Sequence, residues 1–150
     1  MLSKKTILAI VLVVVVIAGV AIGAIALLQS INSSFEEAEN AIDTYINALN
    51  SYNATEAWTL MSPTLRSAKT YSEFEEFVQN LGSSQWRASA KSISSRSLET
   101  ENGRTTATFE LMAKITETDQ IVGTETYTEK WVFNLVKVNS RWMINEWLYQ

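Results

Sequence analysis

The chain offers few side chains that could carry out chemistry. It has no cysteine and no histidine, which removes thiol nucleophiles, disulfides and the commonest general base. Two carboxylates, Glu129 and Glu146, fall at the alternate strand positions whose apolar residues are expected to face the core. A pair of carboxylates inside the core could serve acid–base chemistry. Regular strand pairing places Glu146 opposite Phe133, about 13 Å along a strand from Glu129, which is too far for direct cooperation. We therefore predict no catalytic residue, no metal ligands and no cofactor.

Arg96 is the other charged candidate. The register set by the hairpin turn at residues 102–103 places it inward beside Phe109, where a guanidinium needs a carboxylate or an anionic ligand. Glu146 could be that carboxylate. A bulge within residues 92–97 would instead place Arg96 outside, and the sequence leaves both arrangements open.

Aromatic side chains could line a pocket. Core packing is their ordinary role, but ligand sites are mostly apolar and concave, so a cavity is the alternative. The ligand-binding residues predicted on that hypothesis are Tyr45, Trp58, Phe74, Arg96, Phe109, Trp131 and Glu146.

Residues 6–28 form an apolar run without charge, TILAIVLVVVVIAGVAIGAIALL. As a helix this run would be about 34 Å long, enough to cross a bilayer core of roughly 30 Å. Lys4 and Lys5 precede it, and basic residues are retained in the cytoplasm, so the rest of the chain is predicted outside the cell membrane. The predicted division is a cytoplasmic N-terminus at 1–5, a single transmembrane helix at 6–28 that contacts the lipid bilayer, a linker at 29–33 and an extracytoplasmic domain at 34–150.

Two other interpretations of this run stay open. Residues 24–26, Ala-Ile-Ala, resemble a signal-peptide cleavage site, and cleavage there would release the domain. Cleavage after Lys5 would leave a pilin-like filament subunit, although Thr6 is a poor match to the small residue expected at that point.

The charge excludes one class of partner. The net charge of −4 includes the two lysines before the apolar run, so the remainder carries −6. Nucleic-acid binding needs a basic face, so we predict that the chain does not bind nucleic acid.

Three helices are predicted after the apolar run. Ser34 and Ser72 each stand three residues before a glutamate, as in a capping box, and Asn53 stands three residues before Glu56. Gly82 fits the position just after a helix. Apolar spacings of three and four predict helices over about 35–52, 54–61 and 73–81.

The spacing then changes to an alternation of period two, which predicts four strands at 85–98, 104–117, 123–138 and 141–149. Asn102-Gly103 and, more weakly, Asn139-Ser140 indicate two-residue hairpin turns. With regular pairing, the opposed residues are Ala90 and Ile115, Arg96 and Phe109, Leu135 and Ile144, Phe133 and Glu146, and Trp131 and Leu148.

The reverse face of the last two strands is more apolar than a solvated face should be. Another element of the chain, a second copy of the chain or a membrane protein is expected to cover it. The predicted interface residues are Val132, Val136, Met143, Trp147 and Tyr149.

Helices followed by a long antiparallel sheet make an α+β fold. The chain resembles the nuclear transport factor 2-like superfamily in its long first helix, in the short helix that ends in Leu60-Met61-Ser62-Pro63, and in the closing hairpin KVNSRWMI at 137–144. The resemblance implies three helices packed as a cone on a curved antiparallel sheet of about four strands. Enzymes of this superfamily usually place His, Asp or Tyr inside the cone, and here His is absent while Asp43 and Asp119 fall outside it.

The favoured function is therefore a membrane-anchored, extracytoplasmic binding or accessory module without catalytic activity. It would bind a partner protein or a small apolar ligand in the cone. The alternatives are an enzyme that uses Glu146 and Arg96 in the cone, and a filament subunit.

Overall fold

The computed structural model describes residues 4–119, 121 and 123–149, with side chains from residue 20 onward except at positions 21, 90, 91 and 119. The chain divides into two units, Met1–Ser34 and Phe35–Gln150. One helix, α1 (Lys4–Asn50), spans the boundary between them.

The N-terminal unit is the first part of α1. Because the helix runs through residues 29–34 without a break, the predicted linker at 29–33 and the predicted helix start at Ser34 are both wrong. Where side chains are described, no helix combines the length and the apolar character needed to cross a membrane. Positions 6–19 and 21 of the predicted span 6–28 lie outside that part of the chain.

The C-terminal unit contains a four-stranded antiparallel meander in the order β1-β2-β3-β4. The strands are β1 (Arg87–Glu101), β2 (Arg104–Asp119), β3 (Gly123–Val138) and β4 (Arg141–Tyr149). Both predicted hairpin turns are confirmed, since φ is positive at Asn102 and Gly103 and again at Asn139 and Ser140. That pair of positive angles is the mark of a type I′ turn, whose twist matches the strands it joins.

The register between β1 and β2 is regular only near the turn. Arg96 lies opposite Phe109 as predicted, but two bulges follow, and Ala90 lies opposite Ala113. The predicted pairing of Ala90 with Ile115 is therefore wrong. The bulges do not turn Arg96 outward, because its guanidinium lies over the ring of Phe35 on α1.

A bulge in β4 changes the face of every residue after it. Leu135 pairs with Ile144 as predicted, but the next pair joins Asn134 to Glu146, which leaves Asn145 as the extra residue. Trp147 consequently lies opposite Phe133. The predicted pairs of Phe133 with Glu146 and Trp131 with Leu148 are wrong.

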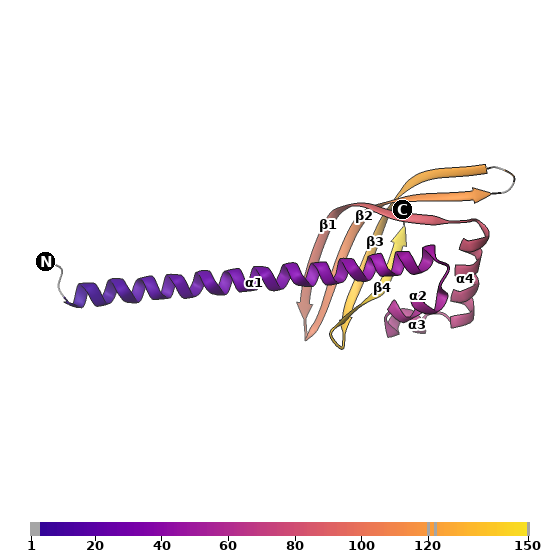
Figure 1. Cartoon of the computed structure of the whole chain (residues 1–150). Helices are drawn as coiled ribbons and strands as arrows, with labels where there is room; N and C mark the ends of the chain where they lie inside the picture. The colour runs from indigo at the N-terminus through magenta and orange to yellow at the C-terminus, as the bar shows by residue number, and fades with distance from the viewer. Residues whose placement is uncertain (1–3, 120, 122, 150) are drawn as a thin grey trace. The chain divides into compact units, whose positions relative to one another are not determined.

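The helices lie over one face of the sheet, with the C-terminal part of α1 across the strands and the three short helices near its end (Figure 1). They are α2 (Ala54–Leu60), α3 (Pro63–Ser67) and α4 (Tyr71–Ser83). The three predicted helices are thus present, with α3 as an additional single turn. The largest fully buried side chains, which form the core between helices and sheet, include Trp131, Phe74, Phe109, Phe133, Leu49 and Met61.

Side-chain caps fix where the short helices begin. Asn53 caps α2 as predicted, through its side chain and the Glu56 amide. The capping box of α4 is formed by Thr70 and Glu73, so the predicted start at Ser72 is two residues late. The helix also continues past Gly82, so the prediction that Gly82 lies just after it is wrong. A Cβ at this position would come within 3.3 Å of the Tyr52 ring.

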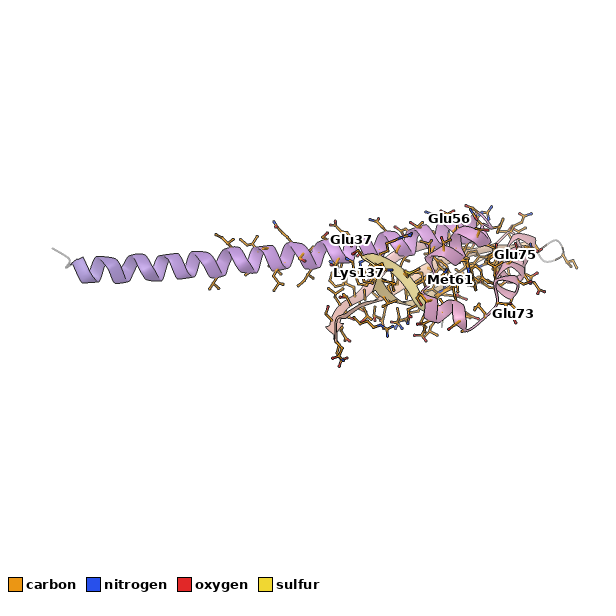
Figure 2. The ribbon with its side chains drawn as sticks, turned by 90° about the horizontal axis from the view of Figure 1, so that it is seen from below. Glu37, Glu56, Met61, Glu73, Glu75 and Lys137 are labelled. Carbon is orange, nitrogen blue, oxygen red and sulfur yellow. The ribbon has the colours of Figure 1, made fainter. Side chains whose placement is uncertain are left out.

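Polar contacts join α1 to the sheet. The Asn50 side chain donates to the Ala88 carbonyl at 2.7 Å and accepts from the Ala88 amide at 2.8 Å, so it pairs with β1 as another strand would. Lys137 Nζ lies 2.9 Å from Glu37 Oε2 on α1 (Figure 2). Surface pairs of this kind contribute little to stability, so the apolar core supplies most of the attachment.

Candidate functional site

A pocket of about 220 Å³ is lined by residues of α4, β2, β3 and β4 and by Trp86, which directly precedes β1. Its lining includes six aromatic side chains, one leucine and two carboxylates. The lining residues are Phe77, Leu81, Trp86, Glu117, Tyr127, Glu129, Trp131, Trp147 and Tyr149.

Three indoles of the pocket lining contact one another. Trp86 stacks on Trp131 with 6.1 Å between ring centroids and 10° between planes. Trp147 meets Trp131 edge-on at 5.0 Å and stacks on Phe133 at 5.9 Å. Because each ring is held by at least one other, the aromatic wall is formed before any ligand arrives.

Two carboxylates of the pocket lining accept hydrogen bonds from its aromatic residues. Glu129 Oε2 accepts a hydrogen bond from Trp131 Nε1 at 3.0 Å. The Tyr127 hydroxyl donates to Glu117. Burial, and then the charges of Glu117 and Glu129, raise the pKa of Tyr127, because a phenolate would be poorly solvated and repelled there.

Strand alternation brings these groups to one face. Tyr127, Glu129 and Trp131 are successive inward positions of β3, and Glu117 continues the inward series of β2. Ala113 lies directly opposite Glu129.

The end of α4 sets the opposite wall. The Gln85 amide bonds the Gly82 carbonyl, the Trp86 amide bonds the Leu81 carbonyl at 2.9 Å, and Gln85 has φ of +47°. This is a Schellman motif, which brings the residue after the left-handed position against the last turn of the helix. Here those two residues are Trp86 and Leu81, and both line the pocket.

One donor of the wall is unpaired. The indole Nε1 of Trp147 is buried without a hydrogen-bond partner, which costs free energy relative to a paired donor. The indole Nε1 of Trp142 is also buried without a hydrogen-bond partner, but Trp142 does not line this pocket.

Of the seven predicted ligand-binding residues, Trp131 lines the pocket. Tyr45, Phe74 and Phe109 are buried in the core, and Trp58 packs against Tyr71 and Phe74. Arg96 forms an ion pair with Glu39 at 2.8 Å. Glu146 is exposed on the reverse face and accepts from Asn134 at 2.6 Å, so it is neither inward nor a partner of Arg96.

The predicted interface residues also divide between two faces. Val132, Val136 and Met143 lie on the reverse face by their pairing and alternation. Trp147 and Tyr149 line the pocket, so they do not share a face with the other three as predicted.

Most residues of the pocket were not predicted from the sequence, because the β4 bulge and the turn at Gln85 determine which side chains line it. One signal was present: Trp147 and Tyr149 made the expected reverse face too apolar. Among the described residues, no group of three or more His, Cys, Asp or Glu side chains could hold a metal ion.

No family model matches the sequence, and no curated protein matches it either. Solved structures do. A nuclear transport factor 2-like superfamily protein from Salmonella enterica shares 14% identity, with 74% of this chain and 85% of that chain covered and a TM-score of 0.56. A protein of unknown function described as NTF-2 like, from Shewanella oneidensis, shares 10% identity over 77% of this chain and 98% of that chain, with a TM-score of 0.57.

A third similar structure is a proposed aromatic ring hydroxylase from Novosphingobium aromaticivorans. It shares 11% identity over 76% of this chain and 85% of that chain, with a TM-score of 0.58. At such low identities the likeness concerns the fold alone. The chain folds as nuclear transport factor 2-like proteins do.

Proposed function

We propose that the chain is a single-pass, membrane-anchored binding module whose C-terminal unit lies outside the cytoplasm and takes a small, mainly apolar ligand. The observation that carries the proposal is the preformed aromatic pocket between α4 and the sheet. Ligand sites are typically concave, mostly apolar and provided with a few polar groups that fix orientation. This pocket has each of those features.

The size of the pocket limits the ligand. An apolar cavity of about 150 Å³ can hold benzene, so about 220 Å³ accommodates one substituted ring or a compact branched group. The volume is below the roughly 300–1,000 Å³ of sites for drug-sized molecules. A large or extended ligand would have to leave most of its length outside.

Binding accounts for the pocket better than catalysis does. Glu146 and Arg96, the pair predicted for an enzyme, lie outside it and are engaged with Asn134 and Glu39. Inside it, the raised pKa of Tyr127 keeps its hydroxyl protonated at neutral pH. Tyr127 can therefore orient a ligand by hydrogen bonding but is poorly suited to act as a base.

The proposed anchor rests on the sequence. Residues 6–28 carry no charge, Lys4 and Lys5 precede them, and the acidic excess follows them. Lipid would contact this segment, and retention of the lysines would leave the pocket-bearing unit outside. A partner protein or second copy on Val132 and Met143 of the reverse face remains an additional proposal.

Pocket binding can be tested with phenol as the probe. We expect saturation-transfer NMR to detect phenol on the full chain in dodecyl maltoside micelles. Leu81→Trp should abolish the signal, because the larger ring fills the space that Leu81 borders. Leu65→Trp on α3, away from the pocket, is the matched control. Equal phenol signals from both variants would contradict the proposed site.

The intact mass of the native protein tests the anchor. A membrane-fraction mass that covers residues 1–150, with or without the first methionine, is expected. A mass beginning at Leu27 would indicate a released domain. A mass beginning at Thr6 would favour the filament subunit instead.

A further inference from the structure

We propose that the pocket selects a small organic cation that carries a quaternary ammonium group, such as a trimethylammonium compound, over neutral molecules of the same shape. The inference rests on the proposed binding function and names its ligand class. It follows from the joint presence of aromatic rings and carboxylates in the lining of one pocket.

The aromatic lining suits a soft cation. Six rings border the pocket, three of them indoles. The face of an aromatic ring is the negative end of its quadrupole, and tryptophan attracts cations most strongly. A methylated ammonium group combines a positive charge with an apolar surface, so it can leave water at lower cost than a bare ammonium and contact several rings together.

The charged residues that line the pocket are all negative. Glu117 and Glu129 border the pocket, and no described residue of its lining is basic. Their hydrogen-bond donors, the Tyr127 hydroxyl and the Trp131 indole, are neutral, so the two negative charges are not compensated within the site. A cation in the pocket would supply that compensation.

Basic side chains near the pocket are directed elsewhere. Arg87, next to Trp86 in sequence, donates to the Asn50 carbonyl at 2.6 Å and lies over the Tyr52 ring. Lys130, next to Glu129, forms an ion pair with Glu110 at 3.1 Å. In the part of the chain that the structure describes, neither pocket carboxylate has an ion-pair partner from Lys or Arg.

Choline and its neutral carbon isostere, 3,3-dimethylbutan-1-ol, isolate the effect of charge. Their shapes are nearly equal, and both carry a hydroxyl group. With the full chain in dodecyl maltoside micelles, titration calorimetry should give choline at least about tenfold tighter binding, because Glu117 and Glu129 attract its charge and the alcohol carries none.

Removal of the carboxylate charge should erase the preference. In Glu117→Gln/Glu129→Gln, choline affinity should fall about tenfold while the affinity for the neutral alcohol stays the same. Glu146→Gln is the matched control, because Glu146 also accepts one side-chain N–H but faces the reverse side of the sheet. It should change neither affinity.

The outcomes separate the two proposals. Equal binding of choline and the alcohol, both lost in Leu81→Trp, would overturn the cation inference and leave the apolar site standing. No binding of either probe at millimolar concentration, together with no phenol signal, would overturn both. A choline preference that persists in the double variant would show that the carboxylates do not select the cation.

Discussion

Because of the bulge at Asn145, truncation of two adjacent residues of β4, Trp147 and Leu148, should have different costs in stability. Trp147 stacks on Phe133 and contacts Trp131 edge-on, whereas Leu148 is 46% exposed. With regular pairing the two would exchange faces. Trp147→Ala and Leu148→Ala therefore measure which register the folded chain adopts.

The expected costs follow from these environments. Truncation of a core tryptophan to alanine costs about 3–5 kcal/mol. Trp147 is half-buried, and its unpaired indole N–H is removed as well, so we expect about 3 kcal/mol. Full burial of a leucine side chain contributes about 1.5–3 kcal/mol, and the exposure of Leu148 reduces its loss to about 1 kcal/mol.

Urea unfolding of the full chain, followed by far-UV circular dichroism, measures both values. The m-value should stay constant, so the midpoints report stability directly. Trp147→Phe is the control, because it keeps a ring on Phe133 and removes the unpaired N–H, and it should cost less than about 1 kcal/mol. A loss for Leu148→Ala equal to or above that for Trp147→Ala would refute the bulged register.

Three further substitutions test how the helices are held, each by urea unfolding. Ser62→Ala should cost about 2 kcal/mol, because Ser62 caps α3 and its hydroxyl donates to Asn145 at 2.9 Å; an unchanged midpoint would contradict this. Arg96→Ala should cost no more than about 1 kcal/mol, since its ion pair is exposed; a larger loss would indicate a buried role. Burial raises the pKa of Tyr45, so the unfolded state ionises first and wild-type stability should fall as pH rises above about 10. Tyr45→Phe should show a weaker decline in stability between about pH 9 and pH 11, and identical slopes would refute the assignment.

Features that depend on local backbone preference were predictable. Asn102-Gly103 and Asn139-Ser140 tolerate positive φ, so both hairpin turns and the pairs nearest to them follow from the sequence. Period-two alternation located the four strands, and Asn53 marked the start of α2. The apolar spacing of 35–52 likewise identified the face of α1 that covers the sheet.

The candidate site was less predictable, because its members depend on contacts between distant residues. Inward alternation along β3 pointed to Tyr127, Glu129 and Trp131. The place of Trp147 could not be deduced in this way, since one extra residue in β4 exchanges its face. The start of α4 was placed two residues late, at Ser72 in place of Thr70, because both positions satisfy the capping pattern. Ser34 satisfies it too, but α1 continues through Ser34 and no helix begins there.

The sequence by itself determined an α+β domain with two tight hairpins, a net negative charge and no histidine or cysteine chemistry. Only the tertiary structure decided which aromatic residues form the pocket. Turn type is a property of two adjacent residues, whereas a bulge is stabilised by what it touches. Asn145 leaves the regular ladder where it accepts a hydrogen bond from Ser62, 83 residues earlier in the chain, and that contact exists only once the helices are packed against the sheet.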